Sequence, residues 1–393
     1  MSRLLGAVSR EELARRWDLA RGHLVDRQLD AVIAVASDAN LDGGYVRWLT
    51  HEPFAYRRAI VFHAGDLMTS IEHGPQGVVR NSDGDQETQR GVGEIRSVAM
   101  FPAVGYSNAT LFDAIADVVD RRGYRAVGLL GGASMPHGLI ATLEARLGGR
   151  TRFTDDSEFF DAAIARKSAA EQALIRATIG MQSRAFEAVL EAVRPGMRDL
   201  DVTNLVKRAC HAEGGMGGIA LAGSAPPGTP APMQMDNRQG RTIAPGDTLN
   251  LLIETTGPGG YYAELGRTLV FGRAPAELQD AFALALEAQT LSRSATRPGA
   301  APADVFAAYN RFLAQRGQGP ELRVHSHSQG YDIVSRPLIR DDETLGIAAD
   351  MFFSVHPGIG SPTTFAFLCD NFFVGRDAAG ETLHAVPQQL FEV

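Results

Sequence analysis

The chain has 393 residues, of which 45% are apolar and 21% are charged. These are the fractions of an ordinary globular protein, so they exclude a disordered chain, a collagen-like chain and a coiled coil. At about 150 residues per domain, the length indicates two or three domains. The 46 acidic and 38 basic side chains give a formal net charge of −8, which argues against a nucleic-acid partner.

The compartment is predicted from the cysteines and the N-terminal segment. Two cysteines, Cys210 and Cys369, are too few for a disulfide framework and fit a reducing cytosol. The chain becomes charged between Ser9 and Arg16, before any apolar stretch long enough for secretion, and no apolar run approaches about 18 residues. We therefore expect a cytoplasmic protein that does not bind membranes.

The N-terminal part of the chain alternates between helix and strand patterns. Ser9 and Glu12 have capping-box spacing, and apolar residues follow at helical intervals, which predicts an amphipathic helix. Residues 31–36 (AVIAVA) are continuously apolar, as in a strand buried on both faces. Further strands are predicted at 59–62, 67–71 and 126–130, and a helix at 111–121. This alternation predicts an α/β domain over residues 1–160, which ends in the acidic segment 155–161.

The C-terminal part, residues 161–393, begins with helical patterns. Helices are predicted over about 168–192 and 201–213, because Arg-Pro-Gly at 194–196 stops the first one. Residues 214–239 are rich in Gly, Pro and Ala and are predicted to form a long loop of functional interest. Strands are predicted at 248–254 and around 261–271.

Several residues of this part recur at a constant offset of 103. Arg194-Pro195-Gly196, Asp201-Val202 and Asp247 recur as Arg297-Pro298-Gly299, Asp304-Val305 and Asp350. We interpret the pattern as an internal duplication, whose two halves would face one another across a pseudo-twofold axis and form one central cleft. A chance match is the alternative, because the matched residues are few and Arg-Pro-Gly is a common helix break.

Three of the histidines stand in contexts that favour chemistry. His325 and His327 lie two residues apart in a strand-like segment and are expected to share one face. His356 follows an apolar strand and precedes Pro-Gly, so its ring is expected at the rim of a pocket. The alternative for each is an ordinary core or surface histidine.

Charged residues elsewhere could complete such a site. Glu254 and Glu264 flank a glycine-rich loop that permits a tight hairpin, which would turn at least one carboxylate inward. Arg57 and Arg58 precede a predicted strand and could bind a substrate carboxylate, since a guanidinium group binds carboxylates at two points. Solvated surface charges are the alternative in both cases.

Taken together, these segments resemble the creatinase, prolidase and methionine aminopeptidase superfamily, peptidase family M24, which has the pita-bread fold. The resemblance covers nearly the whole chain. In the N-terminal domain it is carried by Leu29 to Ile33, Asn40-Leu41 and Tyr45. In the catalytic domain it is carried by Arg166-Lys167-Ser168 with Glu171 and Ile175, Pro245-Gly246-Asp247, Gly260 to Thr268, His327-Ser328-Gln329-Gly330 and Met351 to Gly358. It implies an α/β (α+β) protein: a creatinase-like N-terminal α/β domain over residues 1–160 and a pseudo-twofold pita-bread catalytic domain over residues 161–393.

The same resemblance implies where metal ligands would lie. Metallopeptidases of this superfamily hold two metal ions with two Asp, one His and two Glu. These positions fall on Ile253, Glu264, His327, His356 and Cys369, so only the histidine is unchanged. A further family histidine that binds the substrate falls on Met235. The resemblance therefore implies a divergent member without a two-metal centre, and no cofactor is predicted.

Creatinase cleaves a C–N bond without metal, so the resemblance implies a homodimeric hydrolase of similar chemistry acting on a small carboxylate-bearing substrate. His327, His356 and Glu264 would be the acid and base groups. Tyr262 would line the pocket. The arginines that could bind the substrate carboxylate are Arg57 or Arg58 and Arg336 or Arg340.

Two alternatives stay open. Glu264, His327, His356 and Cys369 are residue types that could bind one Zn, Fe or Mn ion, as in a mononuclear hydrolase similar to Xaa-Pro peptidases or a lyase similar to dimethylsulfoniopropionate lyases. The other alternative is a non-catalytic pseudoenzyme that binds a ligand.

Overall fold

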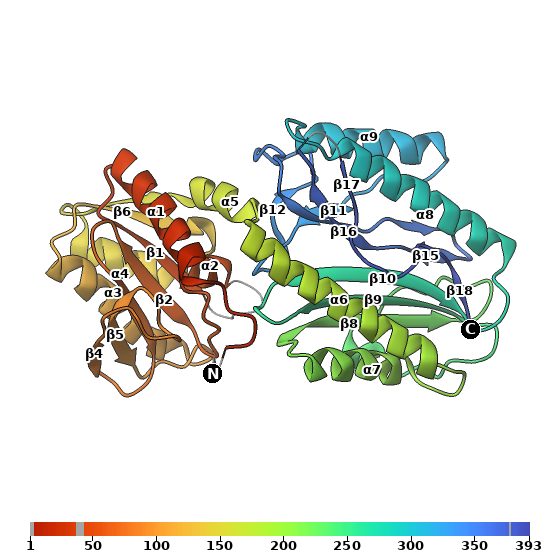
Figure 1. Cartoon of the computed structure of the whole chain (residues 1–393), viewed down its shortest axis with the longest axis horizontal. Helices are drawn as coiled ribbons and strands as arrows, with labels where there is room; N and C mark the ends of the chain where they lie inside the picture. Colours follow the sequence, from red (N-terminus) through yellow and green to blue (C-terminus); the bar gives the residue numbers. More distant parts are fainter. Residues whose placement is uncertain (1–3, 37–42, 377–378) are drawn as a thin grey trace. The chain divides into compact units, whose positions relative to one another are not determined.

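The computed structural model describes residues 4–36, 43–376 and 379–393. The chain divides into two compact units, residues 1–164 and 165–393 (Figure 1). None of the helices in the described ranges combines the length and the apolar character needed to span a membrane. Asn40 and Leu41, which carry part of the resemblance, lie outside the described residues.

The first unit is built on a seven-stranded sheet with the strand order β4-β5-β3-β2-β1-β6-β7. Its strands are β1 (Ala31–Ala36), β2 (Arg58–His63), β3 (Met68–His73), β4 (Val79–Asn81), β5 (Val92–Val98), β6 (Ala126–Leu130) and β7 (Arg152–Asp155). Its helices are α1 (Arg10–Asp26), α2 (Gly44–Thr50), α3 (Ala109–Arg121), α4 (His137–Leu147) and α5 (Ser157–Ala165), with 3-10 turns at Gly105–Asn108 and Gly132–Ser134. The central strand β1 runs antiparallel to β2 and parallel to β6. Because β1 is buried on both faces, its continuous apolar run predicted its bounds correctly.

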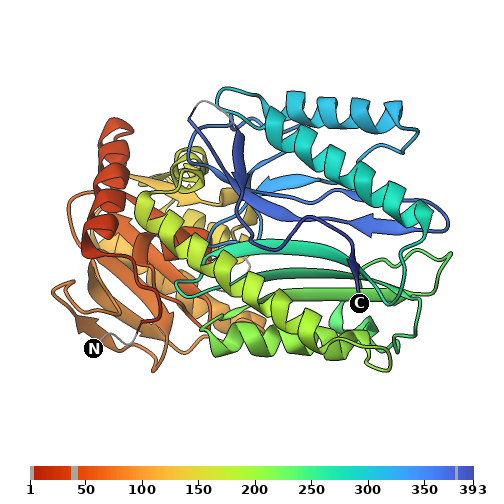
Figure 2. The same ribbon diagram turned by 45° about the vertical axis from the view of Figure 1, so that its right-hand side comes forward.

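The second unit contains a four-stranded sheet, β18-β10-β9-β8, a five-stranded sheet, β12-β11-β13-β16-β17, and the pair β14-β15. Its helices are α6 (Ala169–Ala192), α7 (Asp199–Ala212), α8 (Ala276–Ala295) and α9 (Pro302–Gln315), with a 3-10 turn at Asp236–Arg238. Its strands are β8 (Gly217–Ala225), β9 (Thr248–Thr256), β10 (Tyr262–Val270), β11 (Ser326–Ser328), β12 (Ser335–Leu338), β13 (Phe352–Val355), β14 (Gly358–Gly360), β15 (Phe365–Phe367), β16 (Asp370–Val374), β17 (Ala379–Thr382) and β18 (Phe391–Glu392). Figures 1 and 2 show α6 and α7 together on the side of β8 to β10, and α8 and α9 together on the side of the other strands.

The element order of the second unit repeats with the predicted offset. Helix α7 begins and ends 103 residues before α9, and α6 ends 103 residues before α8. In each half, a helix pair packs its apolar side against the strands that follow it. The duplication therefore places two similar sets of strands in one unit, between two helix pairs.

The predicted loop at residues 214–239 is wrong over part of its length, because residues 217–225 form β8. All nine residues of this strand pair with β9. The strand has the glycine and alanine content of a loop because the backbone is crowded there: a Cβ atom at Gly223 would lie 2.0 Å from the Pro232 carbonyl oxygen. The close approach of residues 232–233 therefore requires a small residue in the strand, and such small residues hid the strand pattern in the sequence.

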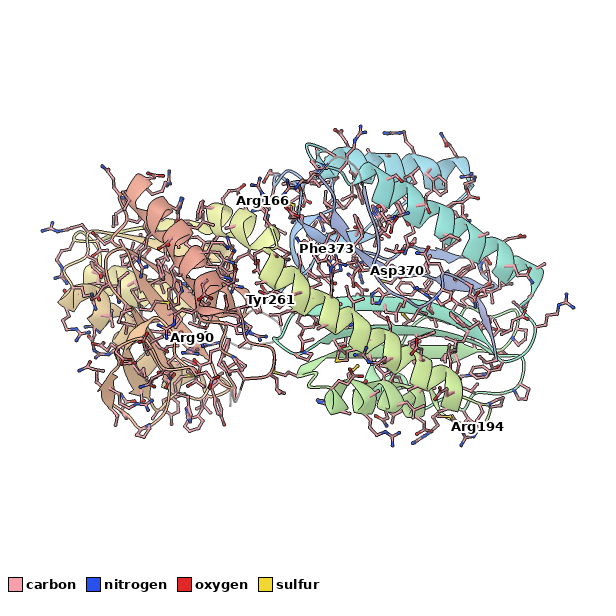
Figure 3. All side chains as sticks on the ribbon, in the orientation of Figure 1. Arg90, Arg166, Arg194, Tyr261, Asp370 and Phe373 are labelled. Carbon is pink, nitrogen blue, oxygen red and sulfur yellow. The ribbon has the colours of Figure 1, made fainter. Side chains whose placement is uncertain are left out.

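The interior of the second unit contains an ion pair between Arg267 and Asp370. The Arg267 guanidinium group donates to both carboxylate oxygens of Asp370 at 2.8 and 3.2 Å, and both side chains are buried. Arg267 also donates to the carbonyl oxygens of Val386 and Pro387. Asp370, labelled in Figure 3, accepts further bonds from Gln289 and Gln388. This pair joins β10, β16 and the C-terminal segment.

Candidate active site

The carboxylates of the site come from the hairpin of β9 and β10. Glu264 lies directly opposite Glu254 in the register of the two strands. Residues paired in this way point to the same face of a sheet, and both glutamates are nearly buried. Ile253 pairs with Leu265 on the other face, in the apolar core. The carboxylate opposite Glu264 therefore belongs to Glu254. It lies one residue after Ile253, the residue on which a metal-binding Asp of the family falls.

Tyr262 is the next residue of β10 on the face of Glu264. Its backbone N–H donates to the Gly330 carbonyl oxygen at 2.8 Å, and its side chain is buried. This places the predicted pocket tyrosine on the same strand face as the glutamates, two residues from Glu264.

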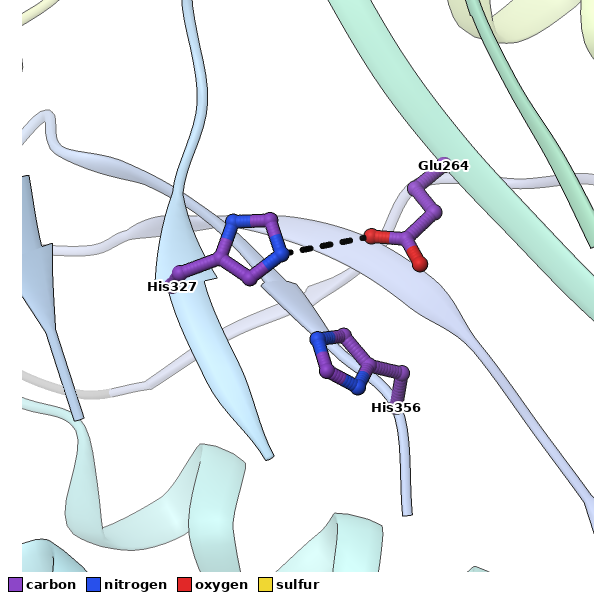
Figure 4. A group of neighbouring side chains, drawn as sticks. All are labelled: Glu264, His327 and His356. Carbon is purple, nitrogen blue, oxygen red and sulfur yellow. Dashed lines mark ion pairs between the residues drawn. The ribbon is translucent and has the colours of Figure 1, made fainter. Parts of the chain in front are cut away.

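The imidazoles come from the second repeat. His327 lies in β11, and His356 directly follows β13, with ring centres 5.1 Å apart. His327 Nε2 lies 3.7 Å from Glu264 Oε2 (Figure 4). His327 Nδ1 lies 3.0 Å from the Ser328 carbonyl oxygen, which can only accept, so Nδ1 carries the proton of the neutral ring. The lone pair on Nε2 therefore faces the carboxylate.

Burial keeps both rings uncharged. It lowers the pKa of His327 to about 4, with a further lowering by His356. It lowers the pKa of His356 to about 4 as well, and Arg323 adds to this. At neutral pH the site therefore offers two neutral imidazoles, which can accept protons or bind a metal ion.

Three of the predicted residues could hold a metal ion together. One ligand atom each from Glu264, His327 and His356 lies within 4.8 Å of the others, and no further residue joins this group in the described ranges. Two imidazoles and one carboxylate suit one divalent ion such as Zn. The same set does not supply the five ligands of a two-metal centre.

Cys369, the fourth residue of the single-metal alternative, does not belong to that group. Its Sγ lies 3.2 Å from Ser354 Oγ and donates to the Glu264 carbonyl oxygen at 3.6 Å. Burial, with repulsion from Glu264, raises the pKa of the thiol well above its usual value. Cys369 is therefore a neutral, hydrogen-bonded thiol beside the site.

The sequence interpretation missed the residues that hold Glu264 in place. Ser354 Oγ donates to Glu264 Oε2 at 2.5 Å. Asn371 Oδ1 accepts from the Glu264 backbone N–H at 2.6 Å, and His384 Nε2 lies 3.1 Å from the Glu264 carbonyl oxygen. Ser354 could have been found as a polar residue inside an apolar strand two positions before His356. Asn371 and His384 lie far from the motifs in sequence and offered no such signal.

His325 does not share the surroundings of His327. Its ring stacks on Tyr309 with centres 3.6 Å apart, and its Nε2 lies 2.9 Å from Ser292 Oγ. The prediction of a shared face is wrong because β11 begins only at Ser326, so the period of two does not extend to His325. His325 is a core histidine between β11 and the helices α8 and α9.

The candidate carboxylate-binding arginines are all engaged with other groups. Arg58, in the first unit, is buried and donates to Glu52 at 2.7 Å and to Ser70 at 3.0 Å. Arg57, in the same unit, donates to Asn108 at 2.9 Å. In the second unit, Arg336 on β12 donates to Glu343 at 2.5 Å. Arg340 is exposed and donates to Asp342 at 2.8 Å.

Comparisons with known proteins agree with this architecture. The model of metallopeptidase family M24 matches residues 173–376, more than half of the chain. The X-Pro aminopeptidase from Thermotoga maritima MSB8 is similar with a TM-score of 0.77 at 16% identity, over 96% of this chain and 99% of that chain. A prolidase from Thermococcus sibiricus gives 0.78 at 16% identity, over 98% and 100%. The dipeptidase PepE from Mycobacterium ulcerans gives 0.73 at 21% identity, over 98% and 98%.

No curated protein matches the sequence. The three structures match nearly the full length of the chain, and the predicted fold is confirmed.

Proposed function

Because this chain belongs to metallopeptidase family M24, a family of hydrolases, we propose that it cleaves a C–N bond in a small carboxylate-bearing substrate by general acid and base catalysis. The observation that carries the proposal is the pair of neutral imidazoles beside Glu264, of which His327 is buried and His356 is half-buried. A neutral imidazole with its Nε2 lone pair directed at a carboxylate is equipped to exchange a proton in the reaction.

The roles of the three residues follow from their contacts. His327 Nε2 takes a proton from the attacking water and returns it to the leaving nitrogen. Glu264, 3.7 Å away, stabilises the imidazolium that forms in between. His356, whose ring centre is 5.1 Å from that of His327, orients the water or the substrate. Tyr262 lines the pocket from the same strand as Glu264.

Arg336 is the proposed partner of the substrate carboxylate, since β12 pairs with the strand of His327. Arg57 and Arg58 are the alternatives from the first unit. A homodimer and a cytoplasmic location complete the proposal, and sedimentation analysis and cell fractionation test them.

The acid and base roles are tested by His327→Ala and His356→Ala. Each change should lower kcat by roughly 10²-fold or more, while the melting temperature stays nearly unchanged. The substrates to screen are guanidino, amidino and N-substituted amino acids beside Xaa-Pro dipeptides. Loss of folding in both variants, or full activity in either, would contradict the assigned roles.

A second candidate rests on the ligand atoms of Glu264, His327 and His356 within 4.8 Å of one another. These residues would hold one divalent ion, which supplies a Lewis acid and lowers the pKa of a bound water. Elemental analysis before and after chelator treatment, with the His327→Ala, His356→Ala double variant as control, separates the two candidates. About one metal per chain, lost in the variant, would favour a mononuclear enzyme.

A further inference from the structure

One edge of β10 is completed at Glu264 by two side chains instead of a strand. On one side β10 pairs with β9 along its whole length, whereas on the other side β18 reaches only Leu269 and Val270. The backbone of Glu264 faces this second side, because its N–H donates to Asn371 Oδ1 at 2.6 Å. Its carbonyl oxygen lies 3.1 Å from His384 Nε2. Two side chains from distant parts of the sequence therefore take the place of a neighbouring strand at Glu264.

The contacts of His384 identify the ring nitrogen that carries the proton. Nε2 lies 3.1 Å from the Glu264 carbonyl oxygen and 3.3 Å from Asn371 Oδ1. The Glu264 N–H can only donate, so the Asn371 atom that it meets is the amide oxygen, and the amide nitrogen donates to Gln329 Oε1 at 3.0 Å. Both neighbours of Nε2 are therefore acceptors. Nε2 carries the proton and donates to both, which closes a set of hydrogen bonds around the backbone of Glu264.

The ring of His384 makes no other hydrogen bond to the described residues. The residue is 8% exposed, and its Nδ1 is buried without a hydrogen-bond partner in that part of the chain. A buried nitrogen without a partner destabilises the fold, so an apolar side chain would suit a purely structural position better. The hydrogen bonds that the ring does make all go to Glu264 and to Asn371, which indicates a role at the site.

The C-terminal segment holds this ring in place on both sides of His384. The N–H of Leu383, directly before it, donates to the Asn371 carbonyl oxygen at 3.0 Å. After it, the carbonyl oxygens of residues 386–387 accept hydrogen bonds from Arg267 at 2.8 and 2.9 Å. The backbone that carries the ring is therefore fixed, although it lies 120 positions from the glutamate in the sequence.

We propose that His384 is a positioning residue, which together with Asn371 fixes the backbone of Glu264 and so sets the 3.7 Å separation of its carboxylate from His327 Nε2. The inference rests on the proposed role of Glu264 and extends the site to the C-terminal segment. Without the donor on His384, the Glu264 carbonyl oxygen keeps only the contact from the Cys369 thiol at 3.6 Å, which is a weak donor. The strand would then shift at Glu264, and a displacement of about 1 Å in a reacting group lowers a rate by as much as roughly 10²-fold.

The first test observes His327 directly and needs no substrate. Full-length protein labelled with nitrogen-15 in its 10 histidines gives ring signals that single variants assign. His384→Leu, which removes the donor and keeps a side chain of similar size, should shift the Nε2 signal of His327 and leave the ring signals of His325 unchanged. His384→Gln, whose amide places an N–H near the former Nε2, should restore the His327 signal of the unaltered protein. An unchanged His327 signal in His384→Leu, or equal shifts in both variants, would overturn the inference.

Gln388→Leu is the matched control in the same segment. The Gln388 amide donates to Gln289 and to Asp370 and has no contact with the glutamate, so this variant should leave the signal in place. A shift of the same size in Gln388→Leu would assign the effect to the packing of the segment and overturn the inference. If His384→Leu does not fold, His384→Asn, whose shorter amide is withdrawn from the Glu264 carbonyl oxygen, should shift the signal instead, and an unshifted signal there would overturn the inference.

The second test uses a substrate identified for the proposed function. His384→Leu should lower kcat roughly tenfold or more and change KM by less than about threefold, while His384→Gln recovers most of the lost kcat. An unchanged kcat in His384→Leu, or the same loss in both variants at an unchanged melting temperature, would overturn the positioning role. Failure of the proposed function is seen separately, as absence of cleavage by the unaltered protein, and a shifted His327 signal in His384→Leu would still support the positioning of Glu264.

Discussion

Two groups of buried charged residues lie in the second unit, and they differ in whether an opposite charge is bound to them. Arg267 and Asp370 are fully buried and bind each other at two points, and the remaining donors of Arg267 reach backbone carbonyl oxygens. Glu254 and Glu264 lie on the neighbouring hairpin face, and no Lys or Arg of the described residues binds either of them. The first group is balanced within the protein, whereas in the described ranges the second has no cationic side chain bound to it.

The difference separates a structural role from a functional one. A buried ion pair with complete hydrogen bonding stabilises its own geometry and leaves nothing for a ligand. A like-charge pair that is held in place by Ser354 and Gln329 has no such balance until a proton, a metal ion or a substrate supplies positive charge. Buried charge is thus balanced within the protein in one place, and in the other we propose that it takes part in the chemistry of the site.

The largest effect expected from this comparison is the loss of Arg267. Arg267→Ala leaves Asp370 as an uncompensated buried charge, so the free energy of unfolding should fall by about 3–5 kcal/mol. Denaturant unfolding measures it. A loss below about 1 kcal/mol would show that the pair does not join β10 to the C-terminal segment.

Acidification should weaken the fold through the histidines that are neutral in the folded protein. Burial lowers the pKa of His63, His327, His356 and His384 to about 4 and that of His51 to about 3. With an unfolded pKa near 6.5, each of these rings adds stability that is complete above pH 6.5 and is lost as the pH falls toward 4. For each one, the loss approaches about 1.4 kcal/mol per pH unit within that window.

Unfolding with chelator present, from pH 7 to pH 4, checks this expectation. The variant His384→Asn should show a shallower dependence than the unaltered protein, because one proton fewer separates the unfolded from the folded state. An identical slope would mean that His384 is not buried as a neutral ring.

Removing a charge from the glutamate pair should raise the free energy of unfolding, whereas removing the charge of Arg267 should lower it. Glu254→Gln relieves the repulsion between paired carboxylates and is expected to raise the free energy of unfolding by roughly 0.2–1 kcal/mol. Parallel denaturation of Glu254→Gln and of Glu287→Gln, which alters an exposed carboxylate on α8, measures the difference. A large destabilisation would place Glu254 with Asp370 among the structural charges.

The smallest effect is expected at an exposed pair. Arg340 and Asp342 bind each other at 2.8 Å on the surface, where water screens the charges. Arg340→Ala should change the free energy of unfolding by less than about 0.5 kcal/mol, and in kinetic assays it should change KM less than Arg336→Ala does. A larger effect on KM for Arg340→Ala than for Arg336→Ala would assign the substrate carboxylate to Arg340 instead of Arg336.

The sequence predicted the family, the fold class and the bounds of β1 and β6 correctly. These follow from motifs and from apolar runs, which are local. Glu264, His327 and His356 were also predicted together, because each of them lies in a motif of the family resemblance. The structure brings their ligand atoms within 4.8 Å of one another.

The remaining features depend on contacts that no local pattern contains. Opposing Glu254 to Glu264 requires the strand register, which the length of the glycine loop sets. The amide chain of Gln329 and Asn371 joins residues 42 positions apart. Strand β8 was hidden because Gly223 leaves room for the close backbone of residues 232–233, a contact that the local sequence pattern does not contain.

The carboxylates and the imidazoles of the site come from different repeats of the internal duplication. Both carboxylates come from the first repeat, on β9 and β10, and both imidazoles come from the second, at β11 and β13. A chain cut between β10 and α8 would therefore yield one fragment that carries both glutamates of the site and one that carries both histidines. The second fragment would also carry β18, which pairs with the end of β10 in the sheet of the first. Fragment complementation would thus be guided by a strand that crosses from the base-bearing half into the acid-bearing one.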